Sequence, residues 1–422
     1  MDALLTYAHE FADAGRAAAT ALATASGAVR SQALRALARS LRDHADRLIA
    51  ANASDIAAAE QAHLDRPLIE RLKLDPKRID KMALACEQIA EQPDPIGQIL
   101  EGYVRPNGLR IQKQRVPLGV VLFIYESRPN VTTDAAALAI RSANAVILRG
   151  GKETLHTNAI LAEIISQSLE QSKLPAKAVQ IVATPDRALL PHLLKLAGKI
   201  DLVIPRGGAG LIRAVSEQSV IPVLKHFDGN CHLYIDSSTE QMERAVRDVC
   251  VNAKTSYPGG AVCNAVEHIL FHKDAAPRLL AKVCDDLANK GVEIRACERS
   301  RVFYPKAGHI GDDDWSTEYL AFVVGVKVVD SIDDAIAHIN RYGSHHTDGI
   351  LADSASAIEQ FVQRVDSASV MINASTRFAD GGEYGLGAEL GISTDKLHAR
   401  GPMGAADMTS TKWIVIGRGH CR

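Results

Sequence analysis

The chain has 422 residues, and its 48 lysines and arginines against 50 aspartates and glutamates give a formal net charge of −2. This balance argues against a basic nucleic-acid-binding protein. The longest apolar run, residues 116–125, is far shorter than the ~20 residues of a membrane-spanning helix, so we expect no membrane anchor. Asp2, Glu10 and Asp13 interrupt the stretch where a signal peptide would be apolar, and we expect a cytoplasmic protein.

The cysteines number seven and are scattered without a C-x-x-C pair. An odd number in this arrangement argues against a disulfide framework and against structural zinc, so we expect no metal. In a reducing compartment most cysteines are small buried hydrophobes, and the local sequence must decide whether one is a nucleophile.

The first hundred residues are predicted to be helical. Leu34, Leu37, Leu41 and Leu48 recur at helical spacing with charged residues between them. The pattern then changes to short apolar strands separated by helices, which is typical of a parallel sheet buried on both faces. The predicted strands are residues 119–125, 145–149, 179–184, 201–206 and 221–226.

This α/β pattern predicts a doubly wound dinucleotide-binding domain over residues 1–102 and 118–230. A second α/β stretch, residues 231–400, is predicted to be a catalytic domain. Residues 103–117 and 405–422 each look like a strand without a local partner, and we expect them to pair between subunits of a homo-oligomer.

Two predicted strands end in glycine and basic residues. Arg149, Gly150, Gly151 and Lys152 follow one strand, and the segment Arg206, Gly207 and Gly208 follows another. Unpaired amides at a helix N-terminus favour phosphate, although paired glycines can also serve helix–strand packing alone. Lys152 suits a 2′-phosphate, which favours NADP(H), while Glu153 beside it argues the other way.

Cys263 stands out among the cysteines because Pro258, Gly259 and Gly260 precede it and can hold a thiol in an open loop. Amides of the following turn and the nearby Lys254 would lower the pKa of such a thiol and help to form an oxyanion hole. Cys250 and Cys284 lie on amphipathic helices and are explained by core packing. Cys231 could form a Cys–His unit with His226 or His232, or could line a cofactor pocket.

Several blocks resemble one enzyme family. "YESRPNVT", "NAKTSYPGGAVCNAVEHIL" and "NASTRFADGGEYGLGAELGIST" are similar to the γ-glutamyl phosphate reductase (glutamate-5-semialdehyde dehydrogenase) family of proline biosynthesis, a branch of the aldehyde dehydrogenase superfamily. The resemblance runs from Ala17 to the C-terminus. It implies an aldehyde-dehydrogenase-like α/β fold with a cofactor domain, a catalytic domain and a small oligomerisation β-segment.

The resemblance also implies roles for individual residues. Cys263 would be the nucleophile and Asn130 a donor of the oxyanion hole. Arg149 and Lys152 would lie along the adenosine ribose and its phosphate, and Glu318 at the nicotinamide ribose. The segment Arg206, Gly207 and Gly208 would lie near the pyrophosphate, and Gly150 and Gly151 would let the backbone approach the cofactor at the other turn. Candidates for the substrate's α-carboxylate and amine are Arg128, Asn264, Ser375 and Arg377.

The implied reaction is the NADPH-dependent reduction of L-glutamyl 5-phosphate to L-glutamate 5-semialdehyde and phosphate through a cysteine thioester. A separate glutamate 5-kinase would supply the acyl phosphate, and the enzyme would be a homo-dimer or tetramer. One departure is that two more residues separate Lys254 from Cys263 than is usual in the family. Two alternatives stay open: an aldehyde oxidiser that activates water with Asp228, and a non-catalytic nucleotide-binding or scaffold protein.

Overall fold

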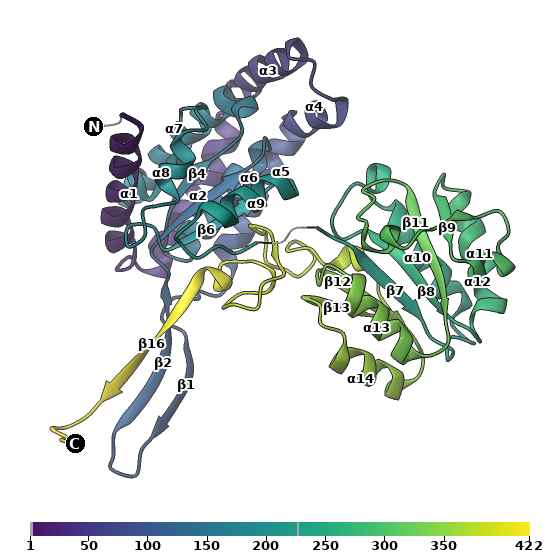
Figure 1. The fold of residues 1–422 in the computed structure, drawn as a ribbon. Coiled ribbons are helices and arrows are strands. Elements are labelled where there is room, and N and C mark those ends of the chain that lie inside the picture. Colours follow the sequence, from purple (N-terminus) through teal and green to yellow (C-terminus); the bar gives the residue numbers. More distant parts are fainter. Residues whose placement is uncertain (1–2, 226–227) are drawn as a thin grey trace. The chain divides into compact units, whose positions relative to one another are not determined.

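The computed structural model describes residues 3–225 and 228–422, which form two compact units (Figure 1). The first unit lies within residues 1–225, 385–391 and 397–422, and the second within 226–384 and 392–396. The predicted limits therefore need correction, because 231–400 does not stay together. Ala388, Leu390 and Ala399 are buried in the core of the first unit, which explains why residues 385–391 and 397–400 belong to that unit.

Helices form the N-terminal part of the first unit, as the sequence predicts. Leu34, Leu37, Leu41 and Leu48 are all buried in its core. Ser26 caps the second of these helices by accepting a hydrogen bond from the amide of Val29, which satisfies one of the unpaired N–H groups at the helix start. The helices are α1 (Ala3–Leu22), α2 (Gly27–Asp43), α3 (Ala45–Gln61), α4 (Arg66–Leu72) and α5 (Pro76–Glu91).

A parallel sheet in the order β5-β4-β3-β6 forms the centre of this unit. Its central strand β3 is buried at every residue, so side chains cover both faces, as the doubly wound prediction requires. The strands are β3 (Val120–Tyr125), β4 (Ala145–Arg149), β5 (Val179–Ile181) and β6 (Leu202–Arg206). The helices between and after them are α6 (Pro129–Arg141), α7 (Leu155–Gln171), α8 (Leu189–Leu193) and α9 (Ala209–Gln218).

The strand predicted at 221–226 is wrong for its described residues. It is reduced to a single bridge between Val223 and Val203, because Pro222 has no N–H with which to continue a ladder. His226, at its end, lies outside the described residues.

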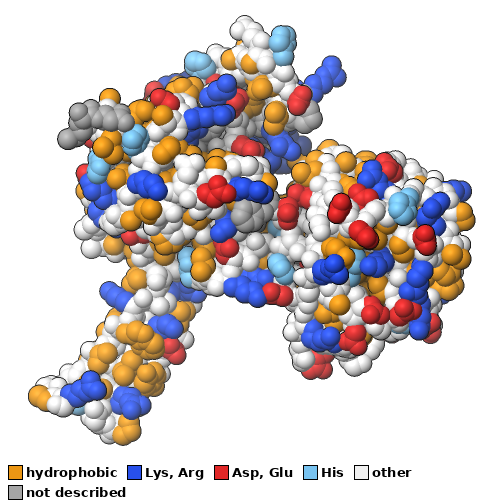
Figure 2. Space-filling view, viewed as in Figure 1, with side chains coloured by type: hydrophobic (Ala, Val, Ile, Leu, Met, Phe, Trp, Pro, Cys, Tyr) orange, Lys and Arg blue, Asp and Glu red, His pale blue; other side chains and the backbone are white. Residues whose placement is uncertain are grey.

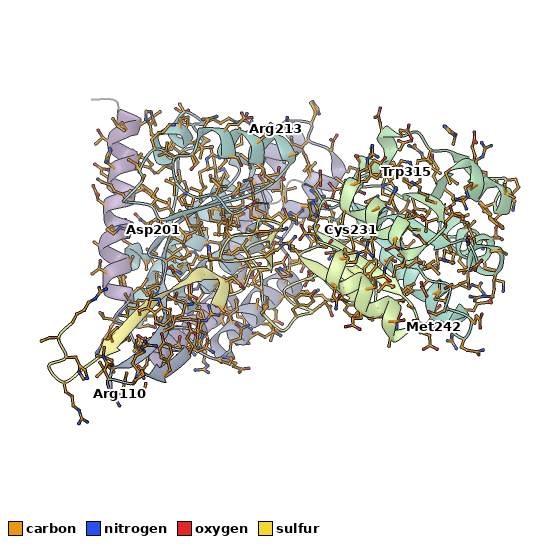
Figure 3. All side chains as sticks on the ribbon, turned by 60° about the horizontal axis from the view of Figure 1, so that its bottom comes forward. Arg110, Asp201, Arg213, Cys231, Met242 and Trp315 are labelled. Atoms are coloured by element: carbon orange, nitrogen blue, oxygen red, sulfur yellow. The ribbon has the colours of Figure 1, made fainter. Side chains whose placement is uncertain are left out.

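The amino end of the sheet is held by Asp201, labelled in Figure 3. Its Oδ2 accepts a hydrogen bond from the amide of Val120 at 2.7 Å and pairs with Arg16 Nη2 of α1 at 2.8 Å. Asp201 thereby joins β3, β6 and α1 at the amino end of the sheet. The opposite, carboxyl end is the one at which sheets of this kind bind ligands.

An antiparallel arm extends from the first unit and consists of β1 (Ile99–Val104), β2 (Arg110–Pro117) and β16 (Thr409–Ile416), in that order (Figure 1). The prediction that residues 103–117 lack a local partner is wrong, because β1 pairs with β2 as an antiparallel hairpin. The C-terminal segment has no neighbouring partner in sequence, but β16 pairs with β2 of the same chain, from Thr409 opposite Pro117 to Ile416 opposite Arg110. Hydrophobic side chains gather along the arm in Figure 2. The exposed ones are Ile99, Leu100, Tyr103, Val104, Trp413, Val415 and Ile416.

The second unit is built on a parallel sheet in the order β10-β9-β11-β8-β7-β12-β13 (Figure 1). It confirms the predicted second α/β unit. Its strands are β7 (Cys231–Ile235), β8 (Val266–His272), β9 (Glu293–Ala296), β10 (Gly308–His309), β11 (Val323–Val329), β12 (Thr347–Leu351) and β13 (Ser369–Ile372). Its helices are α10 (Glu243–Thr255), α11 (Ala276–Ala288), α12 (Glu298–Phe303), α13 (Ile332–Tyr342) and α14 (Ala355–Arg364). The short strands β14 (Ile392–Ser393) and β15 (Gly401–Pro402) follow in the tail. None of the helices in the described ranges is long and apolar enough to cross a membrane.

Candidate active site

The carboxyl ends of β4, β3 and β6 are neighbours in the first unit and bring the two glycine turns to one edge. A Cβ on Gly151 would overlap the hydroxyl of Ser127, and a Cβ on Gly207 would lie 2.8 Å from Glu126 Oε1. A larger residue at either position would therefore crowd the side chains of the loop after β3. The amide of Gly208, at the start of α9, donates to Glu126 Oε1 at 2.8 Å.

The basic residues of the β4 turn have different surroundings. Lys152 is exposed at the start of the 3₁₀ turn η1 (Lys152–Thr154), where an ammonium can meet a phosphate. The neighbouring Glu153 accepts a hydrogen bond from the Ser127 hydroxyl and is thereby engaged within the protein. Arg149 donates to the carbonyl oxygens of Gly150 at 2.8 Å and Pro185 at 3.1 Å, so its guanidinium braces the turn. Burial lowers the pKa of Arg149.

At the end of β6, Arg206 is directed towards the Gly385–Gly391 segment. Its Nη1 donates to the carbonyl oxygen of Glu389 at 3.0 Å, and its Nη2 lies 3.7 Å from Glu389 Oε1. The exposed residue Asn130, in the first turn of α6, donates from Nδ2 to Asp134 Oδ2 at 3.1 Å. Burial raises the pKa of Asp134 to about 6, although the Asn130 bond opposes the shift. Arg128 precedes the same helix as its N-cap residue.

The predicted nucleophile, Cys263, is partly exposed in a loop of the second unit. The loop begins with η3 (Pro258–Gly260), in which Gly259 and Gly260 both have φ of 69°, a conformation that favours glycine. Short turns follow: the amide of Val262 donates to Gly260 and that of Ala265 to Val262, each at 3.0 Å. The glycines thus absorb the longer connection in a compact series of turns.

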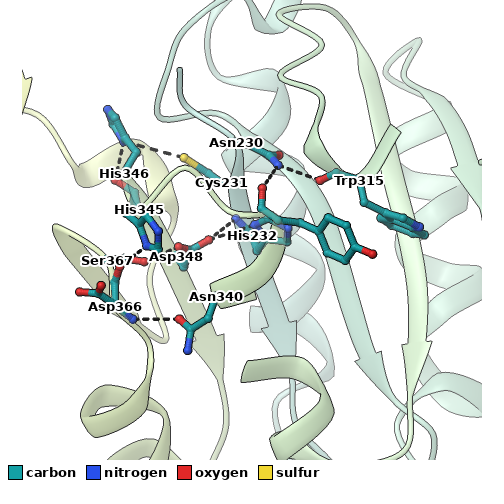
Figure 4. A network of polar contacts seen from close by, with 12 residues as sticks. Asn230, Cys231, His232, Trp315, Asn340, His345, His346, Asp348, Asp366 and Ser367 are labelled. Atoms are coloured by element: carbon teal, nitrogen blue, oxygen red, sulfur yellow. Dashed lines mark hydrogen bonds and ion pairs between the residues drawn. The ribbon is translucent and has the colours of Figure 1, made fainter. Parts of the chain in front are cut away.

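The main chain of Cys263 rests against the start of β7. A Cβ on Gly229 would overlap the carbonyl group of Cys263, so the two backbones touch directly. The thiol of Cys231 donates to the Cys263 carbonyl oxygen at 3.2 Å. His346 Nδ1 lies 3.9 Å from the same sulfur (Figure 4).

One alternative and one prediction about the surroundings of the nucleophile are corrected. His232 does not pair with Cys231, because its Nδ1 lies 3.1 Å from Asp348 Oδ1 within a buried pair (Figure 4). Lys254 does not act on the thiol as an uncompensated charge. It is completely buried, and its Nζ lies 2.7 Å from Oε2 of the equally buried Glu267.

Glu318 and Asp228 lie at the same edge of the second unit. The backbone N–H of Gly229 donates a hydrogen bond to Glu318, but burial outweighs this bond and raises the pKa of Glu318 to about 7. Burial also raises the pKa of Asp228, and the two carboxyl groups repel each other electrostatically. A carboxyl that is neutral near pH 7 can donate a hydrogen bond to a sugar hydroxyl as well as accept one.

The substrate candidates of the second unit form one cluster. Asn264 Nδ2 donates to the carbonyl oxygens of Ala379 at 3.0 Å and Arg377 at 3.4 Å, which ties the residue after the nucleophile to the 3₁₀ turn η5 (Thr376–Phe378). Ser375 caps this turn. Arg377 Nε donates to the Ser256 hydroxyl at 3.2 Å, while its buried Nη1 has no hydrogen-bond partner among the described residues. A buried guanidinium nitrogen in this state is a ready donor for a carboxylate.

The structure thus brings Cys263, Asn264, Ser375 and Arg377 together in the second unit. The glycine turns, Arg128 and Asn130 gather in the first. Sequence reasoning missed Gly229, Asp134 and Glu267 as supporting residues. The one available signal was the i, i+4 spacing of Asn130 and Asp134, which places both on one helix face. No cluster of His, Cys, Asp and Glu suited to a metal occurs in the part of the chain that the structure describes.

Comparison with known proteins gives consistent matches. Residues 5–295 match the sequence model of the aldehyde dehydrogenase family. A γ-glutamyl phosphate reductase from Thermotoga maritima is 39% identical, with 98% of this chain and 99% of that chain covered and a TM-score of 0.94. The corresponding reductase from Saccharomyces cerevisiae is 30% identical over 98% of both chains, with a TM-score of 0.54.

A more distant match concerns the fold alone. An engineered glycolyl-CoA reductase with bound NADP⁺ is 14% identical over 97% of this chain and 96% of that chain, with a TM-score of 0.69.

Proposed function

The chain belongs to the aldehyde dehydrogenase family, among the γ-glutamyl phosphate reductases, and from this we propose that it reduces L-glutamyl 5-phosphate to L-glutamate 5-semialdehyde with release of phosphate. The observation that supports the proposal best is the presentation of Cys263. It is a partly exposed thiol whose main chain is fixed on β7 and whose neighbour Asn264 is tied to the Arg377 turn.

The chemistry begins at the Cys263 sulfur. The thiolate attacks the acyl carbon, the bond from that carbon to the phosphate oxygen breaks, and phosphate leaves with the electron pair. The oxyanion formed in this step requires donors, for which we propose the backbone N–H of Cys263 and the side-chain amide of Asn130. Arg377 Nη1 would hold the substrate's α-carboxylate, because this buried nitrogen has no hydrogen-bond partner among the described residues and a guanidinium and a carboxylate form a strong charge-assisted hydrogen bond.

The nicotinamide cofactor, when bound, supplies the hydride that converts the thioester carbon to the aldehyde and releases the thiolate. The glycine turns after β4 and β6 fit a dinucleotide, because they lie at the carboxyl ends of strands in one parallel sheet and carry no side chain that would keep a phosphate from the backbone amides. We propose NADPH, with the exposed Lys152 at the 2′-phosphate and Glu153 turned towards Ser127.

Phosphate dependence of the reverse reaction tests this function. A thioester without a base to activate water persists until phosphate attacks it. We therefore expect NADP⁺ reduction by the semialdehyde to require inorganic phosphate, with arsenate able to replace it. Sustained turnover without either anion would contradict the proposal and identify an aldehyde oxidiser, with Asp228 as the first candidate base.

Replacement of the nucleophile is the companion test. Cys263→Ala should abolish NADPH oxidation in an assay where a glutamate kinase forms the acyl phosphate, while the thermal unfolding of the protein stays close to that of the wild type. Unchanged activity of this variant would exclude the thioester route. If the wild-type protein itself shows no cofactor-dependent turnover, this result would instead favour a non-catalytic protein.

The remaining expectations are also proposals. A separate glutamate 5-kinase would supply the acyl phosphate. We propose a cytoplasmic homo-oligomer that acts in proline biosynthesis, in line with the family membership.

A further inference from the structure

Cys231 is bonded to the nucleophile's own main chain. It is the first residue of β7, it is completely buried, and its thiol donates to the Cys263 carbonyl oxygen at 3.2 Å. That carbonyl belongs to the peptide that joins Cys263 to Asn264. A hydrogen bond at this atom therefore restrains rotation about the Cα–C bond of Cys263, and with it the direction in which the side chain leaves the main chain.

The thiol remains a donor under working conditions. Burial raises the pKa of Cys231 well above its usual value, and the nearby carboxylate of Asp348 raises it further. A protonated sulfur can donate to a carbonyl oxygen, whereas a thiolate would repel it. The same burial prevents Cys231 from reaching a substrate, so its action has to pass through Cys263.

The segment that carries Cys231 is itself rigid. Asn230 Nδ2 donates to the carbonyl oxygens of Trp315 and Tyr342, both at 2.8 Å (Figure 4). Gly229 touches the Cys263 carbonyl group from the same segment. The carbonyl group of Cys263 thus contacts both Gly229 and Cys231. The two hydrogen bonds of Asn230 hold the segment that contains these residues in place.

We propose that Cys231 is a positioning residue, which holds the main chain of Cys263 so that its sulfur faces the acyl carbon. The proposal rests on the proposed function, because it takes Cys263 as the nucleophile. Reactive groups must be held closely to react efficiently, and a misplacement of about 1 Å can cost on the order of a hundredfold in rate.

The experiment compares Cys231→Ala, which removes the donor, with Cys231→Ser, which keeps one. Cys284→Ala is the matched control, since Cys284 is an equally buried cysteine of the same unit in helix α11. We measure kcat and KM for the acyl phosphate. We also measure the rate at which iodoacetamide alkylates Cys263, by mass spectrometry and as a function of pH, in the enzyme without substrate.

We expect kcat of Cys231→Ala to fall about tenfold or more, with KM changed by less than about twofold, because the defect is in orientation rather than binding. The pH profile of Cys263 alkylation should shift in the same variant. Cys231→Ser should restore most of both properties, and Cys284→Ala should leave both near the wild type.

Three results would overturn the proposal: wild-type kcat and alkylation in Cys231→Ala, equal defects in the Ala and Ser variants, or an equal defect in Cys284→Ala. If Cys231→Ala does not fold, Cys231→Val fills the space without a donor and takes its place. The alkylation needs no turnover. A wrong proposed function would therefore appear as an active Cys263→Ala enzyme, and a wrong inference as unchanged Cys263 reactivity.

Discussion

Lys254 and Glu267 form an ion pair in which both side chains are completely buried, with Nζ 2.7 Å from Oε2. Lys254 lies in the last turn of the helix that leads into the nucleophile loop, and Glu267 lies in the strand that follows it. The pair therefore closes the base of this loop. Burial raises the pKa of Glu267 to about 7 and lowers that of Lys254, although each partner opposes the other's shift.

Removal of one partner should be costly. Lys254→Met leaves a buried carboxyl group without its cation, and we expect a loss of about 3–5 kcal/mol in the free energy of unfolding, measured by urea titration. The loss should grow as pH rises, because the lone Glu267 can escape the penalty only by binding a proton. The Lys254→Met, Glu267→Met double variant should recover most of it.

An exposed pair of the same kind is the control. Lys282 Nζ lies 2.6 Å from Glu243 Oε1 near the surface. Lys282→Met should lower the free energy of unfolding by less than about 1 kcal/mol. Equal losses in the free energy of unfolding for Lys254→Met and Lys282→Met would show that burial of the Lys254 pair does not affect stability.

The pH dependence of activity should depend on Asp134. Its carboxylate accepts from the Asn130 amide, and burial places its pKa at about 6. Protonation weakens this charge-assisted bond, so we expect kcat to fall as pH drops through about 6. Asp134→Asn keeps a neutral acceptor at every pH and should remove this acidic limb. An unchanged limb in the variant would assign it to another group.

The same carboxyl should affect stability in the opposite direction. Its pKa in the folded state, about 6, is higher than the 3.8 of an ordinary aspartate. Its contribution to stability is therefore fully present below the unfolded pKa and is lost as pH rises through the folded pKa. We expect the melting temperature of Asp134→Asn, relative to wild type, to increase between these two limits. A constant difference would contradict the linkage.

Lys152 should matter only for a phosphorylated ribose. Lys152→Ala should lower the ratio of kcat/KM for NADPH to that for NADH by roughly ten- to a hundredfold, the range of a charge-assisted phosphate contact of about 1.5–3 kcal/mol. Lys173→Ala, an exposed lysine just beyond the other end of α7, is the control. Equal losses with both cofactors would refute the 2′-phosphate role.

The arm should form the contact between subunits, because its outer strands leave unpaired edges beside exposed apolar side chains. Val415→Lys, or truncation before Thr409, should yield monomer or aggregate in sedimentation velocity experiments, from an oligomeric wild type. Val302→Lys places the same charge at an exposed valine of α12 and should leave the oligomer intact. A monomeric wild-type protein would exclude the arm as an interface.

The sequence alone determined the local features of this protein. Leucines at helical spacing predicted α2 and α3, and continuous apolar runs predicted β3, β4 and β6. Such patterns depend on neighbours along the chain and are legible without a structure. The glycines before Cys263 likewise singled out the loop that presents this thiol.

Only the tertiary structure decided which distant residues meet. Glu267 pairs with Lys254, and the thiol of Cys231 donates to the carbonyl oxygen of Cys263. The last strand, β16, pairs with β2, about 300 positions earlier in the chain. None of these partners could be identified from the sequence. The physical reason is that hydrogen-bond and ion-pair partners are selected by packing. A buried cation, a buried thiol and a strand edge each require a partner, but their own sequence does not specify which part of the chain supplies it.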